Sequence, residues 1–285
     1  MTFAPRRWTS LALGAALLAA CGEGEAGEAG EAGESGNATA ASPSLSAGAG
    51  ERGEGEGGEG GEGEGGEGGE GGIDLAAAAS DAGVFRTGLA IVEAHVLAAR
   101  DAYAAGRAEA AAEMFAHPIG EVLLDMEPVL VAQGVEPFDG LLLSASQAAI
   151  AGESVDAIGA RSDAILAALG AAEQQAPGEN DGRADAVVAA DQIERAVQQY
   201  RRAIEFETYE PYLDGYGFVR TAAAIRARSG EAMAAAAPET TEAIDAALVL
   251  LEAAYPGVER PDALGADISA LTVANSNVQL ALGGE

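Results

Sequence analysis

The sequence predicts an all-α protein, an up-and-down helical bundle of about eight helices in two packed halves, which follows a disordered tether. Residues 73–285 are rich in Ala, Leu and Glu, and their apolar positions recur with the 3.6-residue period of amphipathic helices. Alternating runs of β-branched residues, which would indicate strands, are few. Residues 22–72 are nearly all Gly, Glu, Ala and Ser, a composition that cannot form a core.

Residues 1–21 resemble the signal peptide of a bacterial lipoprotein. Arg6 and Arg7 precede an apolar run over 11–18 that is too short for a permanent membrane span. The run ends in the lipobox-like quartet Leu18-Ala19-Ala20-Cys21. The resemblance implies cleavage before Cys21, lipidation of its sulfur, and acyl chains such as palmitate that hold the protein on a bilayer. The alternative is an ordinary secretory signal in which Cys21 occurs by chance.

The residue after the lipobox carries sorting information in lipoproteins of this kind. Here it is Gly22, whereas Asp at that place retains a lipoprotein in the inner membrane. The resemblance therefore implies a lipid-anchored protein on the periplasmic face, with the outer membrane favoured over the inner.

Residues 22–72 are expected to be a disordered Gly/Glu-rich linker. They contain 13 Glu and a single basic residue, Arg52. Like-charge repulsion would extend such a chain, which favours a solvated spacer that holds the folded domain away from the lipid surface. A loose cation trap is the second interpretation, although isolated Glu residues on a flexible chain form no fixed coordination cage.

The helices of residues 73–285 are delimited by Gly and Pro. Gly106 separates the first two, and the second is expected to be interrupted at His117-Pro118 because proline lacks a backbone donor. The longest break, at 171–183, divides the domain into halves 73–176 and 183–285. The expected helices cover about 85–105, 107–133, 136–151, 153–170, 184–209, 217–230, 238–255 and 261–282.

Composition excludes several kinds of function. The net charge of −31 disfavours binding to nucleic acid, whose phosphates it would repel. The chain has no lysine, which excludes Schiff-base chemistry and a P-loop lysine. Its one cysteine is Cys21, so the folded domain can have neither a disulfide nor a thiolate metal site.

The candidate metal site consists of His95, His117 and Glu121. Both histidines lie eleven positions from Gly106, on opposite sides, so an antiparallel hairpin would bring them to the same height. Glu121 follows His117 by one helical turn, and imidazole and carboxylate suit iron or another divalent cation. On an uninterrupted helix, however, His117 would lie opposite the apolar stripe, so that only a kink at Pro118 would turn it inward. The alternative is a structural role for both histidines.

Two other groups of residues could carry function. Acidic residues on the same hairpin could bind cations or form ordinary solvated faces: Glu93, Glu113, Asp125 and Glu127. Residues 209–218 combine Tyr209, Tyr212 and Tyr216 with acidic residues. This segment is expected to be a long loop between helices that packs onto the bundle, or else a ligand or docking platform.

An exported lipoprotein with two helical halves and a His…Glu pair at a hairpin resembles the imelysin-like family, whose hallmark is Gly-x-His-x-x-Glu. The nearest string here is His117-Pro118-Ile119-Gly120-Glu121, with three residues between His and Glu instead of two. The resemblance implies two helical bundles, a periplasmic or outer-membrane location and a link to iron uptake.

The sequence therefore predicts a non-enzymatic, membrane-tethered helical domain that binds a ligand. Iron or another divalent cation is the first candidate for that ligand. The alternative is a structural or protein-interaction lipoprotein that docks a partner in an envelope complex without metal. A metallohydrolase is not supported, because no sufficient ligand set for one is recognisable.

Overall fold

The computed structural model describes residues 72–284, so that the signal peptide, Cys21 and the tether up to residue 71 lie outside the described residues. These residues form ten α-helices and one π-helical turn, with no strand among them, which confirms the predicted all-α bundle. The elements are α1 (Leu75–Ala78), α2 (Ala82–Ala104), α3 (Ala108–Pro118), η1 (Ile119–Leu123), α4 (Leu124–Ala132), α5 (Asp139–Ile150), α6 (Val155–Glu173), α7 (Gly182–Phe206), α8 (Glu210–Ala236), α9 (Pro238–Ala254) and α10 (Ile268–Gly284).

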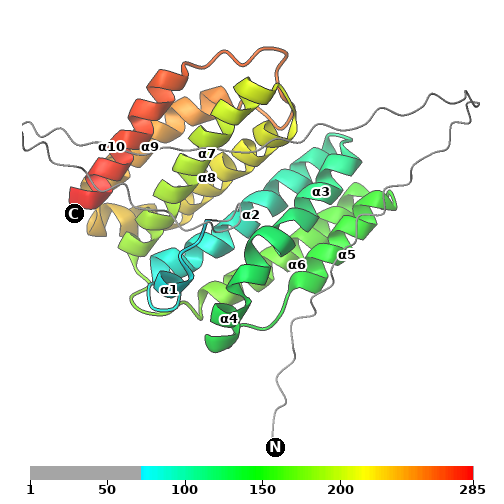
Figure 1. Ribbon diagram of the computed structural model, residues 1–285, viewed down its shortest axis with the longest axis horizontal. Helices are drawn as coiled ribbons and strands as arrows, with labels where there is room; N and C mark the ends of the chain where they lie inside the picture. The colour runs from blue at the N-terminus through cyan, green and yellow to red at the C-terminus, as the bar shows by residue number, and fades with distance from the viewer. Residues whose placement is uncertain (1–71, 285) are drawn as a thin grey trace, which may run out of the picture. The chain divides into compact units, whose positions relative to one another are not determined.

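The long helices fall into two groups, α2–α6 and α7–α10, which lie side by side in Figure 1. Residues 174–181, in the break expected from the sequence, connect them. Helix α2 is central, since it contacts α3 and α6 of its own group and α7 and α8 of the other. One continuous hydrophobic core contains residues of both groups, among them Phe85, Phe115 and Tyr200.

Among the described residues, α2 alone is long and apolar enough to cross a membrane by length and composition. Its most apolar stretch is 89% buried inside the bundle. A helix surrounded by others has no polar face to present to water, so its apolar composition follows from its central position.

The hairpin between α2 and α3 forms as the sequence predicts. Gly106 has φ 85°, a left-handed conformation that glycine adopts without steric cost. Its N–H donates to the carbonyl of Tyr103, and the next N–H, of Arg107, donates to the carbonyl of Ala102. These bonds satisfy the last carbonyls of α2 and end the helix.

The interruption expected at Pro118 takes a different form. Helix α3 continues through Pro118 into the π-helical turn η1, and the N–H of Leu124 bonds to the carbonyl of Ile119. Proline lacks a backbone N–H, and a π turn, which has a wider hydrogen-bonded ring, follows it directly. Because the helix continues, His117 stays on the side opposite the buried Phe115, as the helical wheel predicts.

The expected loop at 209–218 is wrong. Helix α8 begins at Glu210 with Pro211 in its first turn, where the missing N–H of proline costs nothing. Two tyrosine hydroxyls of this segment donate hydrogen bonds to distant backbone carbonyls. Tyr209 donates to the carbonyl of Val258, and Tyr212 donates to that of Gly257. These bonds hold the start of α8 against the connection between α9 and α10. The two tyrosines therefore have a packing role.

The last helix begins later than the sequence suggests, at Ile268 instead of about 261. Asp267 sets this start, because its carboxylate accepts a hydrogen bond from the backbone N–H of Ser269 at 2.8 Å. Such a bond satisfies one of the free donors at a helix N-terminus.

Helices α8 and α2 approach closely at Gly217. A Cβ at this position would lie 2.4 Å from the carbonyl oxygen of Ala94 and 3.1 Å from the Cβ of Ala98. The absence of a side chain at Gly217 therefore allows α8 to pack against α2 beside His95.

We expect Gly217→Ala to destabilise the bundle by about 1–3 kcal/mol, because an added methyl group would push against the backbone of α2. Gly159→Ala in α6 is the matched control, since a Cβ there meets nothing within 4 Å. This control should stabilise the protein by about 0.5–1 kcal/mol through helix propensity. Urea unfolding of both variants checks the two opposite signs, and equal effects would contradict the close approach.

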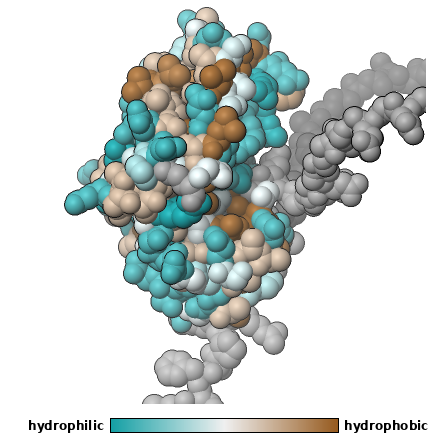
Figure 2. Space-filling model, turned by 90° about the vertical axis from the view of Figure 1, so that its left-hand side faces the viewer, coloured by the Kyte–Doolittle hydropathy of each residue, from teal (hydrophilic) through white to brown (hydrophobic). Residues whose placement is uncertain are grey.

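The face that Figure 2 shows mixes polar and apolar residues, and the most hydrophobic ones lie in separate patches. A shallow groove of about 890 Å³ lies between α9 and α10. Its apolar lining includes Leu250 and Val273, which are 40% and 59% exposed.

Candidate metal centre

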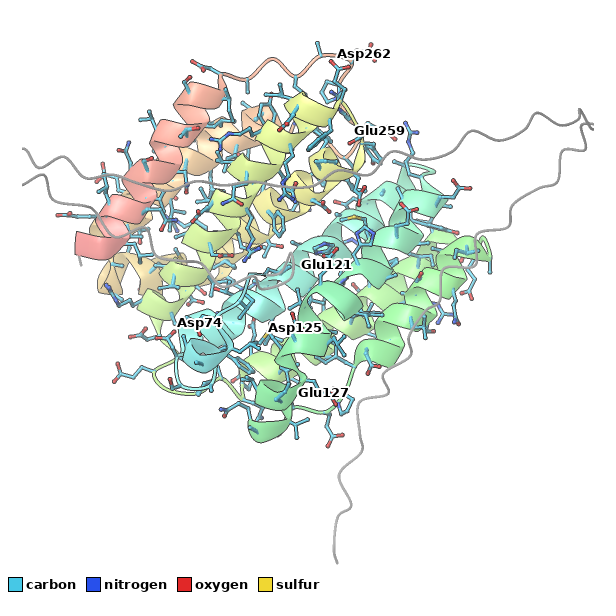
Figure 3. All side chains as sticks on the ribbon, in the orientation of Figure 1. Asp74, Glu121, Asp125, Glu127, Glu259 and Asp262 are labelled. Carbon is cyan, nitrogen blue, oxygen red and sulfur yellow. The ribbon has the colours of Figure 1, made fainter. Side chains whose placement is uncertain are left out.

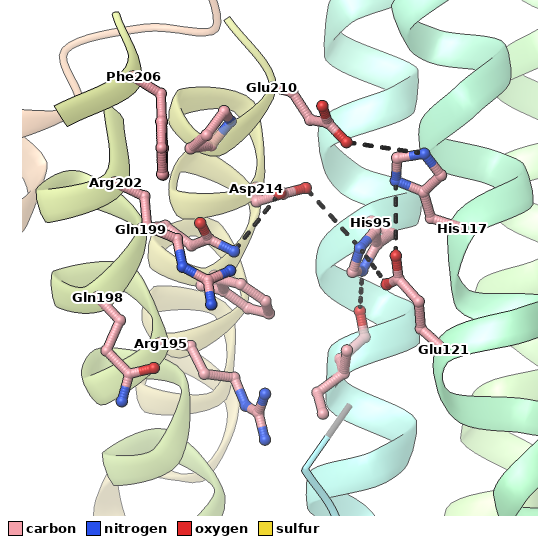
Figure 4. Close-up of a pocket in the computed structure, with 13 residues that line it drawn as sticks. His95, His117, Glu121, Arg195, Gln198, Gln199, Arg202, Phe206, Glu210 and Asp214 are labelled. Atoms are coloured by element: carbon pink, nitrogen blue, oxygen red, sulfur yellow. Dashed lines mark hydrogen bonds and ion pairs between the residues drawn. The ribbon is translucent and has the colours of Figure 1, made fainter. Parts of the chain in front are cut away.

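The candidate site lies in a cavity of about 420 Å³ where the two helix groups meet. Figure 4 shows α2 and α3 on one side of it and α7 on the other. Histidine and carboxylate side chains come from α2, α3, η1 and α8, and Arg195 and Arg202 come from α7. The site therefore depends on packing between helices that are distant in the sequence.

His95 is the most deeply buried member of the site, with a side chain 5% exposed. Its Nδ1 lies 2.8 Å from the backbone carbonyl oxygen of Ile91, one turn earlier in α2. Because a carbonyl can only accept, Nδ1 carries the proton and donates it. Burial lowers the pKa of His95 to about 4, so at neutral pH its Nε2 has a lone pair.

Two carboxylates face this Nε2 atom. Glu121 Oε2 lies 3.5 Å away and Asp214 Oδ1 lies 3.8 Å away. A neutral imidazole nitrogen without a proton and two carboxylate oxygens are all electron donors. A cation between them would attract all three groups.

His117 completes the arrangement from the other arm of the hairpin. Its ring centroid lies 6.3 Å from that of His95, and its Nδ1 lies 3.9 Å from Glu121 Oε1. The Nε2 atom lies 4.0 Å from Glu210 Oε1, at the more exposed side of the cavity. Figure 4 shows Glu121 and Glu210 on opposite sides of the His117 ring.

The spacing of these groups suits a small metal ion. One ligand atom each from His95, His117 and Asp214 lie within 4.8 Å of one another. Ligand atoms about 2.0–2.2 Å from a tetrahedral zinc lie roughly 3.3–3.6 Å apart, so the set is slightly wider than a closed metal centre. A hydrogen bond such as the one from His95 Nδ1 to a backbone carbonyl is the usual way in which a metal-binding imidazole is oriented.

The structure thus brings together the three candidates derived from the sequence. Glu121 lies within 4 Å of His95 and also within 4 Å of His117. His117 remains outside the core of its own half, between His95 of α2 and Glu210 of α8. The helical wheel placed it correctly opposite the apolar stripe. The sequence alone did not show that the second helix group would cover that side.

Asp214 and Glu210 were missed as candidates because their segment was expected to be a loop. As a helix, it presents both carboxylates on one face, four residues apart. Pro211, a common residue in the first turn of a helix, was the available signal. The other acidic candidates lie elsewhere: Figure 3 shows Asp125 and Glu127 away from Glu121, and Glu93 pairs with Arg228 at 3.1 Å.

Comparisons with protein-family models, curated proteins and solved structures give no match to this chain. The function is therefore argued from the geometry of the cavity.

The low pKa of His95 predicts an acid-sensitive fold in the metal-free protein. Unfolding restores the usual pKa of 6.5, so below pH 6.5 the unfolded chain takes up a proton that the folded chain does not. The free energy of unfolding should fall by up to about 3 kcal/mol as the pH decreases from 6.5 to about 4. Above pH 6.5, titration of His95 should not change it.

Urea unfolding at pH 7 and pH 4.5 in the presence of EDTA measures this effect. His95→Gln removes the titrating group and should lose less stability over the same interval. Equal losses in the two proteins would show that the carboxylates near His95 offset the effect of burial.

Proposed function

We propose that residues 72–284 form a binding domain for a divalent transition-metal ion, with His95, His117, Asp214 and Glu121 as ligands. The observation that supports the proposal best is the orientation of His95. Its Nδ1 is committed to Ile91, and its Nε2 points at Glu121 and Asp214. The Nε2 atom of His95 and the two carboxylates would all gain favourable contacts with a cation in the space between the three side chains.

The ligand types narrow the class of metal. Two imidazoles with carboxylates suit iron, zinc, copper or nickel, whereas magnesium and calcium prefer oxygen ligands alone. No thiolate is present among the described residues, since Cys21 is the one cysteine of the chain. Iron or zinc is therefore proposed first, which agrees with the role in iron uptake that the imelysin-like resemblance implies.

The proposal includes attachment to a bilayer by an acylated Cys21, on the periplasmic face and most simply at the outer membrane. Incorporation of labelled palmitate into the expressed chain tests this part. We expect Cys21→Ala to abolish the label and release the protein from the membrane fraction, and a labelled Cys21→Ala protein would contradict it.

Titration of the metal-stripped full chain, purified in detergent, tests the metal site. We expect one Zn²⁺ or, without oxygen, one Fe²⁺ per chain. Because the metal binds the folded state, a free metal concentration of 100 times its dissociation constant should raise the free energy of unfolding by about 2.7 kcal/mol. A chain that retains no stoichiometric Zn²⁺ or Fe²⁺ and melts at the same temperature with and without them does not have the proposed function.

The apolar groove between α9 and α10 favours the alternative function, docking of an envelope protein. Val273→Glu would place a charge in this groove, on a side chain that is 59% exposed. Under the docking hypothesis this variant loses a saturable partner that the unmodified chain captures from envelope extract. Capture that is equal for both proteins would exclude the groove as the docking site.

A further inference from the structure

The cavity is larger than a metal ion requires. One ligand atom each from His95, His117 and Asp214 lie within 4.8 Å of one another, whereas the cavity measures about 420 Å³. A water molecule takes about 30 Å³ in the liquid, and pockets for small organic molecules begin near 300 Å³. Four protein ligands also leave coordination positions open on an iron ion, which commonly takes six. The cavity therefore has room for a second ligand beside the cation.

The wall that faces the proposed metal ligands is formed by hydrogen-bond donors. Arg195, Gln199 and Arg202 lie four and three residues apart, on one face of α7. Figure 4 shows them on the far side of the cavity from His95 and His117. Gln199 donates to Asp214 at 3.5 Å, and Arg195 pairs with Asp191 at 2.7 Å.

Arg202 differs from these two neighbours. Within the described part of the chain, its guanidinium has no hydrogen bond or ion pair with another side chain, and the residue is exposed at the edge of the cavity. A guanidinium presents several donors in a plane that matches carboxylate and phosphate oxygens. Arg202 is therefore available to a ligand that enters the cavity.

The charge of the cavity also changes when a cation binds. The lining carries three carboxylates, Glu121, Glu210 and Asp214, and the guanidinium of Arg202. Arg195 also lines the cavity, but Asp191 pairs with it at 2.7 Å and offsets its charge. The formal charge is therefore −2 with both imidazoles counted as neutral, and a divalent cation brings it to zero. The metal-free cavity thus repels anions, and a bound cation removes this repulsion and offers a local positive charge.

We propose that the cavity binds its cation together with a small dianionic oxyanion, a dicarboxylate or a phosphate, which bridges the open coordination positions of the metal and the guanidinium of Arg202. The inference rests on the proposed metal site, because the anion is retained through the cation. It assigns the role of anion-binding residue to Arg202.

Equilibrium dialysis of the full chain in detergent against radiolabelled malonate, and separately against radiolabelled phosphate, tests the proposal with and without one equivalent of Zn²⁺. We expect one malonate or one phosphate per chain when Zn²⁺ is bound, and none without it. The two probes show which oxyanion is preferred. Metal content of the dialysed protein is measured in the same samples.

Arg202→Gln should weaken retention of the anion by about tenfold or more, because it removes a charge-assisted hydrogen bond. Its affinity for Zn²⁺ without an anion should change less than about threefold, since Arg202 is not a metal ligand. The matched control is Arg201→Gln, which removes the same charge from the next residue, whose side chain contacts Thr272 outside the cavity. This control should alter neither binding step.

The outcomes separate the two proposals. If Zn²⁺ is bound and neither anion is retained, the inference is wrong and the metal site stands. If Zn²⁺ itself is not bound, both proposals are wrong. Equal retention of an anion with and without Zn²⁺, or equal effects of Arg202→Gln and Arg201→Gln, also overturns the inference.

Discussion

Replacing His95 with glutamine should lower the affinity for Zn²⁺ by about 100-fold or more, because even indirect partners of a metal ligand are worth 10–100-fold. His95 is buried, oriented by Ile91 and directed at two carboxylates, so its Nε2 is the most constrained ligand atom of the proposed site. Competition with a metal-binding dye measures the affinity. If His95→Gln bound Zn²⁺ with the affinity of the unmodified protein, the metal would have to bind at another site.

Asp214→Asn tests the ligand that the structure adds to the sequence-derived set. It keeps the size of the side chain and removes its charge, so we expect a loss of affinity of about 10–100-fold. Asp245→Asn is the matched control, since Asp245 lies on α9 and pairs with Arg226 on the surface. Comparable losses in both variants would show that general charge, and not coordination by Asp214, sets the affinity.

Arg86→Met should destabilise the fold by about 3–5 kcal/mol, the largest effect that we expect on stability. Arg86 is 5% exposed on α2 and pairs with Asp185 on α7, which is 8% exposed. It also donates to the side chain of Asn180 at 2.7 Å. The arginine thus connects the two helix groups, and its removal leaves the carboxylate of Asp185 buried without its countercharge.

Urea unfolding measures this loss, and Arg107→Met is the control. Arg107 forms an ion pair with Glu259 at 2.6 Å, but its side chain is 54% exposed, so water screens the pair and we expect a much smaller loss than for Arg86→Met. Adding Asp185→Leu to Arg86→Met should recover most of the stability, because no unpaired charge then remains. Equal costs for Arg86→Met and Arg107→Met would contradict the role of burial.

The part of the fold that could be predicted depends on local patterns. The 3.6-residue period of apolar positions predicted α2, in which Phe85, Leu89 and Val92 are buried. Gly106 predicted the hairpin turn, where it has the left-handed conformation. A helical stripe and a glycine turn are properties of neighbouring residues, so the sequence shows them directly.

The expectations that were wrong concern choices that tertiary contacts decide. Tyr, Gly and Pro in 209–218 favour a loop by propensity, but close packing of Gly217 on α2 and hydroxyl bonds of the tyrosines to distant carbonyls stabilise a helix there. At Pro118 the expectation was incomplete: the α-helix does end there, but a π turn, and not a break between helices, follows it directly.

Local sequence patterns were sufficient for the all-α class, for most of the helix ends and for the equal height of His95 and His117 on the hairpin, but not for their meeting. The tertiary structure decided that Asp214 and Glu210 join them, because these residues reach the histidines only when α8 packs on α2. Periodicity shows which face of a helix is polar, but not which other helix that face meets. That depends on packing of complementary surfaces from distant parts of the chain.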